Sequence, residues 1–287
     1  MKAGVQFFPG SRGPTAVQVA QAAEERGFES LFLPDHSHQP VAAGLDLPDD
    51  YSDLLDPFVT LGAVAASTST IRIGTAVCLV PQRDPIQLAK EVATVDQLSG
   101  GRFDFGVGAG SDPQELRHHG TDPAQRHEVL RERVEAITRI WESDVASYCG
   151  EHVRFGPITS RPRPVTAPRP PILIGGNGRS VLDRVLGYGD GWIPFRAGAE
   201  QVGGDVPPDD GFAAALGGRI AELRARAEAQ DRARPSVTLF NPLPRADALA
   251  AYAGVGVDRV VFWLAPPRGP RSLCGTLDRL IELVRDI

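Results

Sequence analysis

The sequence predicts an α/β protein folded as a closed (β/α)8 barrel, the TIM-barrel fold. Strand-like and helix-like segments alternate eight times along 287 residues. The strand-like segments are continuous apolar runs, as burial of a parallel sheet on both faces requires. An open doubly wound sheet is the alternative, but it usually carries phosphate-binding glycines after its first strand. Here the first turn is PGSRGP, which lacks the G-x-G-x-x-G spacing, so the closed barrel is favoured.

The clearest strand–helix–strand unit spans residues 71–110. An apolar, β-branched run over 71–79 predicts a strand, and residues 85–98 carry apolar side chains at helical spacing. Pro85 suits a first helical position, because its missing N–H is not needed there. The sequence SGG ends the helix, and a second strand begins at Phe103. Two strands joined by a crossover helix imply parallel pairing.

The same pattern assigns the rest of the chain. Strands are expected over 3–8, 29–34, 71–79, 103–110, 170–176, 191–195, 236–242 and 258–265. Helices are expected over 14–26, 57–67, 85–98, 124–142, from about 179, and over 212–230, 246–253 and 272–286. Two segments fall outside the pattern: a long polar loop over 37–55, and a proline-rich stretch over 147–169 with a small hairpin. No domain boundary is evident, which predicts a single domain over 1–287.

Composition limits the class of function. A net charge of -6 without a basic patch argues against nucleic acid as a partner. No run approaches the length of a membrane span, and the N-terminus begins directly with a strand. The three cysteines, Cys78, Cys149 and Cys274, are too few and too dispersed for a disulfide framework, which favours a cytoplasmic protein. Cys78 lies within a strand and is expected to be a small buried hydrophobe.

The active site of such a barrel lies at the C-terminal ends of its strands. The predicted strand ends are rich in glycine and poor in charge: FFP, DH, AVC, GVGAGS, GGN, PFR, NP and Ala265. This composition suits a large planar ligand lying against backbone rather than a hydrolytic site built from carboxylates. We therefore expect a small-molecule ligand at this end of the barrel.

Two glycine turns are candidate ligand contacts. Gly175-Gly176-Asn177-Gly178 lies between a strand and a helix, where backbone N–H groups could hold a phosphate. The turn could equally be only a tight connection. Gly106-x-Gly108-x-Gly110 is ambiguous as well, because Ser111 stands where the dinucleotide-binding motif G-x-G-x-x-G would have its third glycine. Its alternative interpretation is a close-packed strand end.

Asp35-His36 is the one adjacent acid and imidazole at a predicted strand end. Histidine suits proton transfer, or hydrogen bonding to a redox ring. Its alternative role is a structural contact with loop backbone. The H-x-H pattern of His36 and His38 also resembles metal-dependent hydrolases, but the later strands lack further ligands, so no metal is expected. The histidines outside this motif are expected to be solvated: His118, His119, His127 and His152.

Several motifs together resemble the luciferase-like monooxygenase superfamily. They are LFLPDH, IGTAV, DPIQLAKEVATVDQLSGGRFDFGVGAG, HGTDPAQRHEVLRERVEAITRIW and PPILIGGNGRSVLDRVLGYGDGWIPF. They cover roughly residues 1–200 in the family's order and spacing, whereas the last third matches only in pattern. Among the subgroups, the sequence is most similar to single-domain oxidoreductases that use the deazaflavin coenzyme F420.

The resemblance implies a flavin or deazaflavin at the C-terminal mouth of a (β/α)8 barrel. It implies a bulge in the third strand with a non-prolyl cis peptide at Ala76-Val77, which supports the central ring. Asp35 and His36 match the position that contacts the ring, and His36 the catalytic histidine. The ring or its ribityl chain would lie beside residues of the fourth strand end, namely Gly108, Ala109 and Gly110.

The phosphate would be bound, by the same resemblance, by the turn after the fifth strand and by the fourth helix. The residues concerned are Gly175, Gly176, Asn177 and Arg126. Two residues depart from the family pattern. Ser111 stands where many relatives carry Trp, or Glu in sugar-phosphate dehydrogenases, so a catalytic carboxylate is absent there. Val129 stands where relatives often carry a second Arg, which weakens the case for tight phosphate binding. The loop after residue 196 is short of lysine, which argues against a phosphorylated sugar as substrate.

Three hypotheses follow. The first is an F420-dependent oxidoreductase that transfers a hydride between the cofactor and a small organic substrate, with His36 as proton donor or ring anchor. The second is an FMN-dependent monooxygenase that activates oxygen. The third is a non-catalytic flavin or deazaflavin binder, or a barrel that has lost its cofactor, and Ser111 and Val129 are the two residues that support it. The resemblance also implies a homodimer, whereas the loops over 37–55 and 196–211 carry no pattern that identifies a substrate.

Overall fold

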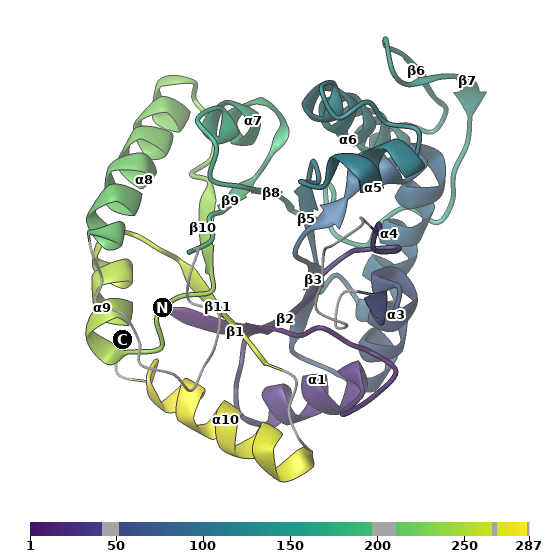
Figure 1. Ribbon diagram of the computed structural model, residues 1–287. Helices are drawn as coiled ribbons and strands as arrows, with labels where there is room; N and C mark the ends of the chain where they lie inside the picture. Colours follow the sequence, from purple (N-terminus) through teal and green to yellow (C-terminus); the bar gives the residue numbers. More distant parts are fainter. Residues whose placement is uncertain (42–51, 197–210, 266–268, 286) are drawn as a thin grey trace.

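The computed structural model describes residues 1–41, 52–196, 211–265, 269–285 and 287, and it forms a parallel β-barrel surrounded by helices (Figure 1). The barrel strands are β1 (Lys2–Gln6), β2 (Ser30–Leu33), β3 (Arg72–Thr75), β4 (Cys78–Leu79), β5 (Phe103–Gly108), β8 (Ile172–Gly175), β9 (Gly191–Ile193), β10 (Ser236–Phe240) and β11 (Arg259–Trp263). Their order is β3-β2-β1-β11-β10-β9-β8-β5-β4, and β3 also pairs with β5. This last pairing closes the sheet, so the predicted barrel is confirmed.

Helices connect successive strands on the outside of the barrel, and most match their predicted ranges closely. They are α1 (Ala16–Glu25), α3 (Pro57–Ser67), α4 (Pro85–Ser99), α6 (Arg126–Glu142), α7 (Val181–Tyr188), α8 (Phe212–Ala229), α9 (Ala246–Gly254) and α10 (Pro270–Glu282). Helix α4 shows why the prediction works. Asp84 accepts hydrogen bonds from the N–H groups of Ile86 and Gln87, and Gly100 ends the helix with φ 64°.

The third predicted strand is interrupted rather than continuous. It divides into β3 and β4 at Ala76 and Val77, and the peptide bond between these two residues is cis. A Cβ on Gly108 would lie 2.4 Å from Cγ2 of Val77, and one on Gly175 would lie 2.6 Å from Cγ1. The two glycines therefore make room for the Val77 side chain between neighbouring strands.

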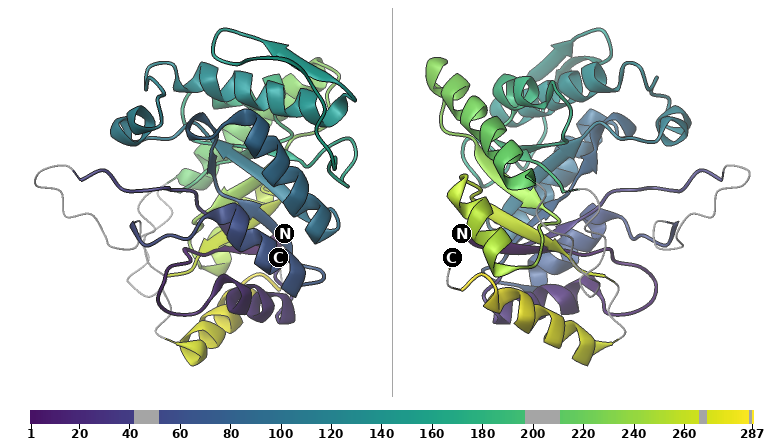
Figure 2. Two further views of the ribbon diagram at one scale, coloured as in Figure 1. Left: turned by 90° about the vertical axis from the view of Figure 1, so that its right-hand side faces the viewer. Right: turned by 60° about the vertical axis from the view of Figure 1, so that its left-hand side comes forward.

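Two elements lie outside the barrel. The predicted hairpin is confirmed as β6 (Ala146–Cys149) and β7 (Arg154–Ile158), which lie alongside α6 at the outer edge of the molecule (Figure 2). A short helix, α5 (Pro113–His118), lies in a polar stretch where the sequence analysis assigned no helix. Its signal is present in the sequence, because Asp112 caps the helix and Pro113 occupies its first position. The predicted loop over 37–55 lies largely outside the described residues.

The core has two parts. A large cluster fills the space between the strands and the surrounding helices, and it includes Cys78, buried as expected. A smaller cluster fills the barrel interior below the mouth: Phe32, Ala76, Leu173, Ile193, Phe240 and Val261, with Val77 packed against it. This inner layer forms the floor on which anything bound at the mouth must rest. Among the described helices, none has the length and apolar character needed to cross a bilayer.

Candidate active site

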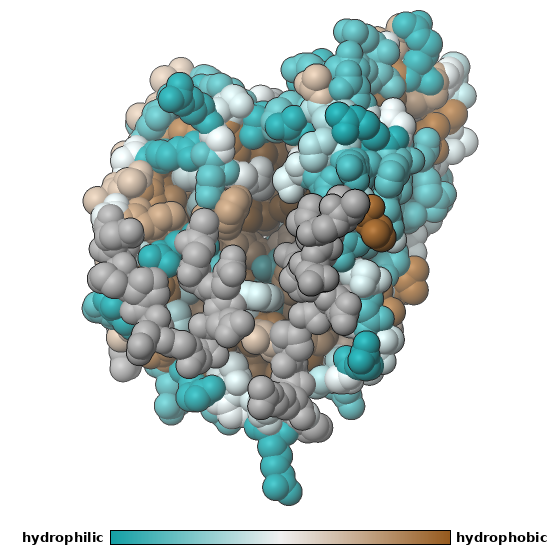
Figure 3. Space-filling model, in the orientation of Figure 1, coloured by the Kyte–Doolittle hydropathy of each residue, from teal (hydrophilic) through white to brown (hydrophobic). Residues whose placement is uncertain are grey.

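A cavity of about 940 Å³ opens at the C-terminal mouth of the barrel. Residues from the ends of all eight barrel strands line it, as the barrel architecture predicts. Figure 3 shows this hollow with apolar residues in its depth and hydrophilic residues around much of its rim. Most of the residues predicted to contact a ligand line the cavity: Asp35, His36, Ala76, Val77, Gly108, Ala109, Gly110, Arg126, Gly175 and Gly176.

Asn177 does not line the cavity. Its side chain donates a hydrogen bond to the carbonyl of Phe195 at 2.6 Å and accepts one from the N–H of Phe195 at 3.2 Å. Its own carbonyl accepts a hydrogen bond from Arg219. The side chain therefore ties the turn after β8 to the chain after β9, and any contribution to ligand binding is indirect.

His36 lies at the mouth directly after β2 and is half-buried. Its Nδ1 atom lies 3.1 Å from Oε1 and 3.2 Å from Oε2 of Glu115, a carboxylate that is 2 % exposed. Glu115 belongs to α5, the helix that the sequence reasoning missed, so this pairing was not predicted. An imidazole held by a buried carboxylate is equipped to hold or transfer a proton.

The Asp35 carboxylate is occupied by the protein itself. It accepts two hydrogen bonds from the guanidinium of Arg83, at 2.7 and 2.9 Å, and one from the N–H of Leu79 at 2.9 Å. Burial opposes the charge of Arg83, but the hydrogen bond and the charge of Asp35 outweigh it and raise the pKa of Arg83. Asp35 thus attaches β4 and Arg83 to the segment that carries His36. Both carboxylate oxygens of Asp35 already accept hydrogen bonds from the protein.

Val77 and Gln6 shape the cavity wall at the bulge between β3 and β4. Gln6 donates a hydrogen bond to the carbonyl of Ala76 at 2.9 Å, which holds the bulge in place. The Val77 side chain covers Gly108 and Gly175. The bulge therefore presents an apolar surface to a flat ligand. The absence of a Cβ on Gly108 and Gly175 leaves the space that the Val77 side chain occupies.

A cationic group of residues also lines the cavity. Arg126, His127 and Arg184 all line it, although His127 was expected to be solvated. Nε of Arg184 and Nδ1 of His127 are buried and have no hydrogen-bond partner among the described residues. Burial lowers the pKa of His127, and the charges of Arg184 and Arg126 act in the same direction. Burial also lowers the pKa of Arg184.

This cluster corrects one inference from the sequence. Val129, which replaces a second Arg of many relatives, is a buried core residue of α6. Arg184 supplies a second guanidinium from α7 instead, where its Nη1 donates a hydrogen bond to Ser180 at 2.8 Å. Buried donors without partners cost free energy, which an anion bound there would offset. The cluster is thus a candidate anion site.

A polar cluster beside His36 consists of Ser37, His38, His118, which is the last residue of α5, and His119, which follows it. The Ser37 hydroxyl lies 2.9 Å from Nδ1 of His38 and 2.7 Å from Nε2 of His119. Nε2 of His38 lies 2.8 Å from Nδ1 of His118. His118 and His119 are exposed, as expected, but they also connect α5 to the segment after β2. In the described part of the chain, no three His, Cys, Asp or Glu side chains are arranged to hold a metal ion.

Comparison with known proteins identifies related sequences and folds. A sequence model described as luciferase-like monooxygenase matches residues 9–248. An uncharacterised protein of Mycobacterium tuberculosis (strain ATCC 25618 / H37Rv) is 37% identical over 290 residues, covering 98% of this chain and 97% of the relative. The F420-dependent hydroxymycolic acid dehydrogenase of the same strain is 31% identical over 231 residues, covering 75% of this chain and 61% of the relative.

Among solved structures, the monooxygenase RslO1 from Streptomyces bottropensis has the same fold. Its TM-score is 0.81 at 19% sequence identity, with 99% of this chain and 98% of that chain covered. At this level of identity the likeness concerns the fold alone.

Proposed function

Because the chain belongs to the luciferase-like monooxygenase family, we propose that it is an F420-dependent oxidoreductase acting on a small organic substrate. One observation carries the proposal. A single cavity is lined both by an imidazole held by a carboxylate and by a cationic group in which two buried nitrogens have no partner among the described residues. The F420-dependent dehydrogenase among the relatives supports the choice of cofactor.

The residues of the cavity fit a cofactor with a planar ring and a phosphate. The buried Nε–H of Arg184 has no partner among the described residues and suits a phosphate. The buried Nδ1 of His127 also lacks one, and it can donate to a phosphate when it carries the ring proton. Gly176 has φ 127°, a conformation that side chains disfavour, so the backbone can lie open to a ligand at this turn. Val77 and the apolar layer beneath it suit the face of a ring. These features together favour a flavin-like ligand over a polar substrate alone.

F420, when bound, supplies or accepts a hydride. Arg126, His127 and Arg184 would bind and orient its phosphate, and Val77 would support its ring. His36 would hold or move the proton that accompanies the hydride, at the imidazole nitrogen not engaged by Glu115. The apolar floor would exclude water from below the reacting atoms. The protein thus contributes orientation, proton handling and exclusion of water.

An FMN-dependent monooxygenase is the second candidate, and the description of the matching family as luciferase-like monooxygenase supports it. The two candidates differ in whether oxygen is consumed. A non-catalytic barrel is the third candidate. The lack of a second Arg at position 129 supported it, but Arg184 supplies a second guanidinium to the cavity. Ser111, which lies where some relatives carry a catalytic carboxylate, is the remaining residue that supports it.

The test is a binding titration of the purified protein with F420 and, separately, with FMN. We expect F420 to bind at micromolar concentration or tighter and FMN to bind at least tenfold more weakly. A preference for FMN, with oxygen uptake, would replace the proposal by the monooxygenase. Binding of neither would favour the barrel without cofactor.

A His36→Ala variant separates binding from chemistry. It should bind F420 within threefold of the unchanged protein yet lose turnover by about 10²-fold or more, the usual contribution of a positioned acid or base. Ser111→Ala is the matched control, because Ser111 lines the same cavity without a proposed proton role. Unchanged turnover in His36→Ala would contradict the assigned role of the imidazole. A homodimer stays a prediction, which light scattering would test.

A further inference from the structure

Glu115 is a buried carboxylate that the resemblance to the family does not assign. It is 2 % exposed. Both of its described side-chain hydrogen bonds go to one atom, Nδ1 of His36, at 3.1 and 3.2 Å. A buried carboxylate is costly unless it is paired, and one paired with a single half-buried imidazole gains little stability. The arrangement therefore points to a role in controlling the imidazole.

Helix α5, which carries Glu115, is anchored to the rest of the protein by several contacts. Asp112 accepts hydrogen bonds from the N–H groups of Gln114 and Glu115, which sets the start of the helix. Leu116 is buried in the protein interior at 1 % exposure. Thr121, just after the helix, donates a hydrogen bond to the carbonyl of Pro81 in the short 3-10 turn after β4. The helix is thus attached both to the core and to the bulged strand.

The segment after β2 is attached to the same helix from the other side. Ser37 contacts His119, and His38 contacts His118. These contacts continue from the His36–Glu115 pair along one edge of α5. A chance approach of two flexible side chains would not be accompanied by this row of contacts.

The chemistry of the contact determines which nitrogen of His36 holds its proton. An ionised carboxylate only accepts hydrogen bonds, so Nδ1 of His36 must be the donor. A neutral imidazole has one N–H, and a free imidazole is not held to this tautomer. With the proton on Nδ1, the lone pair of the neutral ring is on Nε2. When the ring is protonated, the negative charge of Glu115 lies beside the positive charge.

We propose that Glu115 is a positioning residue that holds the proton of His36 on Nδ1 and so makes Nε2 the nitrogen that exchanges protons in the cavity. The catalytic use of Nε2 rests on the proposed function, whereas control of the tautomer by Glu115 does not. Glu115 touches neither substrate nor cofactor in this scheme and acts through His36.

The experiment is ¹⁵N NMR of histidine-labelled protein at about pH 8.5, well above the usual histidine pKa of about 6.5. His36→Gln identifies the resonances of His36. In the unchanged protein we expect the proton on Nδ1, whether the ring is neutral or charged. A neutral ring with its proton on Nε2 would overturn the proposal.

Two substitutions at Glu115 divide the role into its parts. Glu115→Met has similar length but no acceptor, so the His36 proton should move to Nε2. Glu115→Gln keeps an acceptor oxygen, so it should retain the Nδ1 proton and act as the conservative rescue. Gln114→Met is the matched control on the same helix, because Gln114 is exposed and should leave the His36 signals unchanged. A His36 proton that stays on Nδ1 in Glu115→Met would also overturn the proposal.

F420 binding and turnover separate this inference from the proposed function. F420 affinity should stay within threefold in Glu115→Met, which also shows that the variant is folded. Turnover should fall by about 10²-fold, through kcat rather than KM. If His36→Ala retains turnover, the proposed catalytic role fails, yet the tautomer shift in Glu115→Met still tests the control exerted by Glu115.

Discussion

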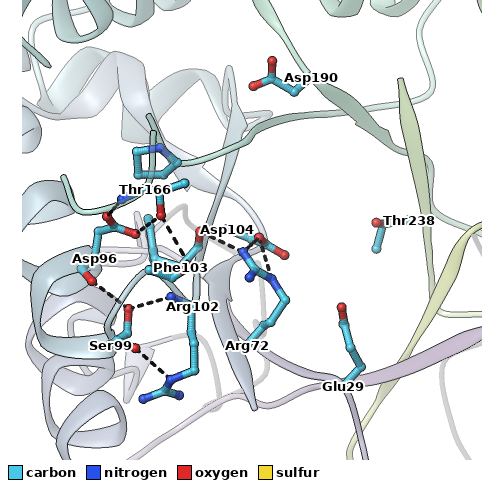
Figure 4. Close-up of polar contacts among 12 residues, drawn as sticks. Glu29, Arg72, Asp96, Ser99, Arg102, Phe103, Asp104, Thr166, Asp190 and Thr238 are labelled. Atoms are coloured by element: carbon cyan, nitrogen blue, oxygen red, sulfur yellow. Dashed lines mark hydrogen bonds and ion pairs between the residues drawn. The ribbon is translucent and has the colours of Figure 1, made fainter. Parts of the chain in front are cut away.

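The two ends of the barrel differ in how completely their polar groups are paired. At the N-terminal end, Arg259 of β11 donates hydrogen bonds to Asp104 of β5 at 2.8 Å and to Glu29 at 2.9 Å. Arg72 of β3 also binds Asp104, and Figure 4 shows their side chains pointing toward each other. At the C-terminal mouth Asp35 and Arg83 are paired too, but Nε of Arg184 and Nδ1 of His127 lack partners in the described residues. The charges of the N-terminal network are therefore bound to one another, whereas the mouth also holds nitrogens that a ligand can engage.

The charged groups of the N-terminal network are buried, so their pairing matters for stability. Asp104 is 2 % exposed and Arg259 is 7 % exposed. Burial by itself would raise the pKa of Asp104, but Arg259 and Arg72 outweigh it and hold that pKa below its usual value. The N-terminal network therefore depends on every member being present. Polar groups without a described partner at the mouth lower the stability of the free protein, and a bound anion would offset this loss. Such a trade-off between stability and function is common at ligand sites.

The largest expected effect comes from removing Asp104. Asp104→Ala leaves two guanidinium groups without their buried partner, which typically costs about 3 to 5 kcal/mol. Chemical denaturation followed by circular dichroism measures this loss. Asp144→Ala is the control, because Asp144 forms ion pairs with Arg161 and Arg163 at an exposed site and should leave the free energy of unfolding nearly unchanged. Equal losses in both variants would contradict the contrast between the ends.

The same network predicts a dependence of stability on acid. Because the folded-state pKa of Asp104 is lowered, its contribution is fully present above the unfolded value, about 3.9. The contribution is lost as the pH falls through the lower folded value. When the pH is lowered from 5 to the pH at which the protein unfolds, the free energy of unfolding of Asp104→Asn should therefore decrease less than that of the unchanged protein. A parallel loss in both proteins would show that other carboxylates govern acid unfolding.

At the mouth, the effect should appear in binding rather than in folding. Arg184→Ala removes a charged donor from the candidate anion site, and such contacts are worth about 1.5 to 3 kcal/mol. F420 affinity should fall by about 10- to 100-fold, while the free energy of unfolding stays the same or rises. Arg179→Ala is the matched control, because Arg179 is exposed in the turn just before the helix that carries Arg184. Equal effects from both substitutions would indicate general electrostatic attraction instead of a site.

The contact between Gly108 and Val77 can be tested by a double-mutant cycle. Gly108→Ala places a Cβ within 2.4 Å of Cγ2 of Val77, and overpacking of this kind costs about 1 to 3 kcal/mol. Val77→Ala removes the obstructing methyl groups. The double variant should therefore lose less stability than the sum of the single variants. Additive losses would mean that Gly108 is required for another reason.

The fold was predictable because its signals are local. Apolar runs mark the strands, and residues such as Asp84, Pro85 and Gly100 mark the helix ends within a few positions of where they act. The strand ends that form the mouth follow directly from the barrel architecture. Asp35, His36 and the Gly175 turn were therefore placed at the cavity from sequence alone.

The pairings within the site were not predictable in the same way. Glu115 reaches His36 across 79 positions of sequence, and Asp35 binds Arg83 across 48. Arg184 replaces the Arg missing at position 129 from a different helix. Such pairings are set by how helices pack around the barrel, and no spacing in the sequence encodes them. The capping signal of Asp112 and Pro113 could have located α5, but not the partner of its carboxylate.

Asn177 gives the smallest expected effect and the sharpest contrast with Arg184. The resemblance to the family places Asn177 and the Gly175 turn at the phosphate. In the structure, however, the Asn177 side chain is exposed and hydrogen-bonded to the backbone of Phe195. Asn177→Ala should therefore change F420 affinity by less than about threefold, since only the tether between two loops is lost. The same titration compares it with Arg184→Ala. If Asn177→Ala matches the loss in Arg184→Ala, the turn must rearrange on binding so that this amide meets the phosphate directly.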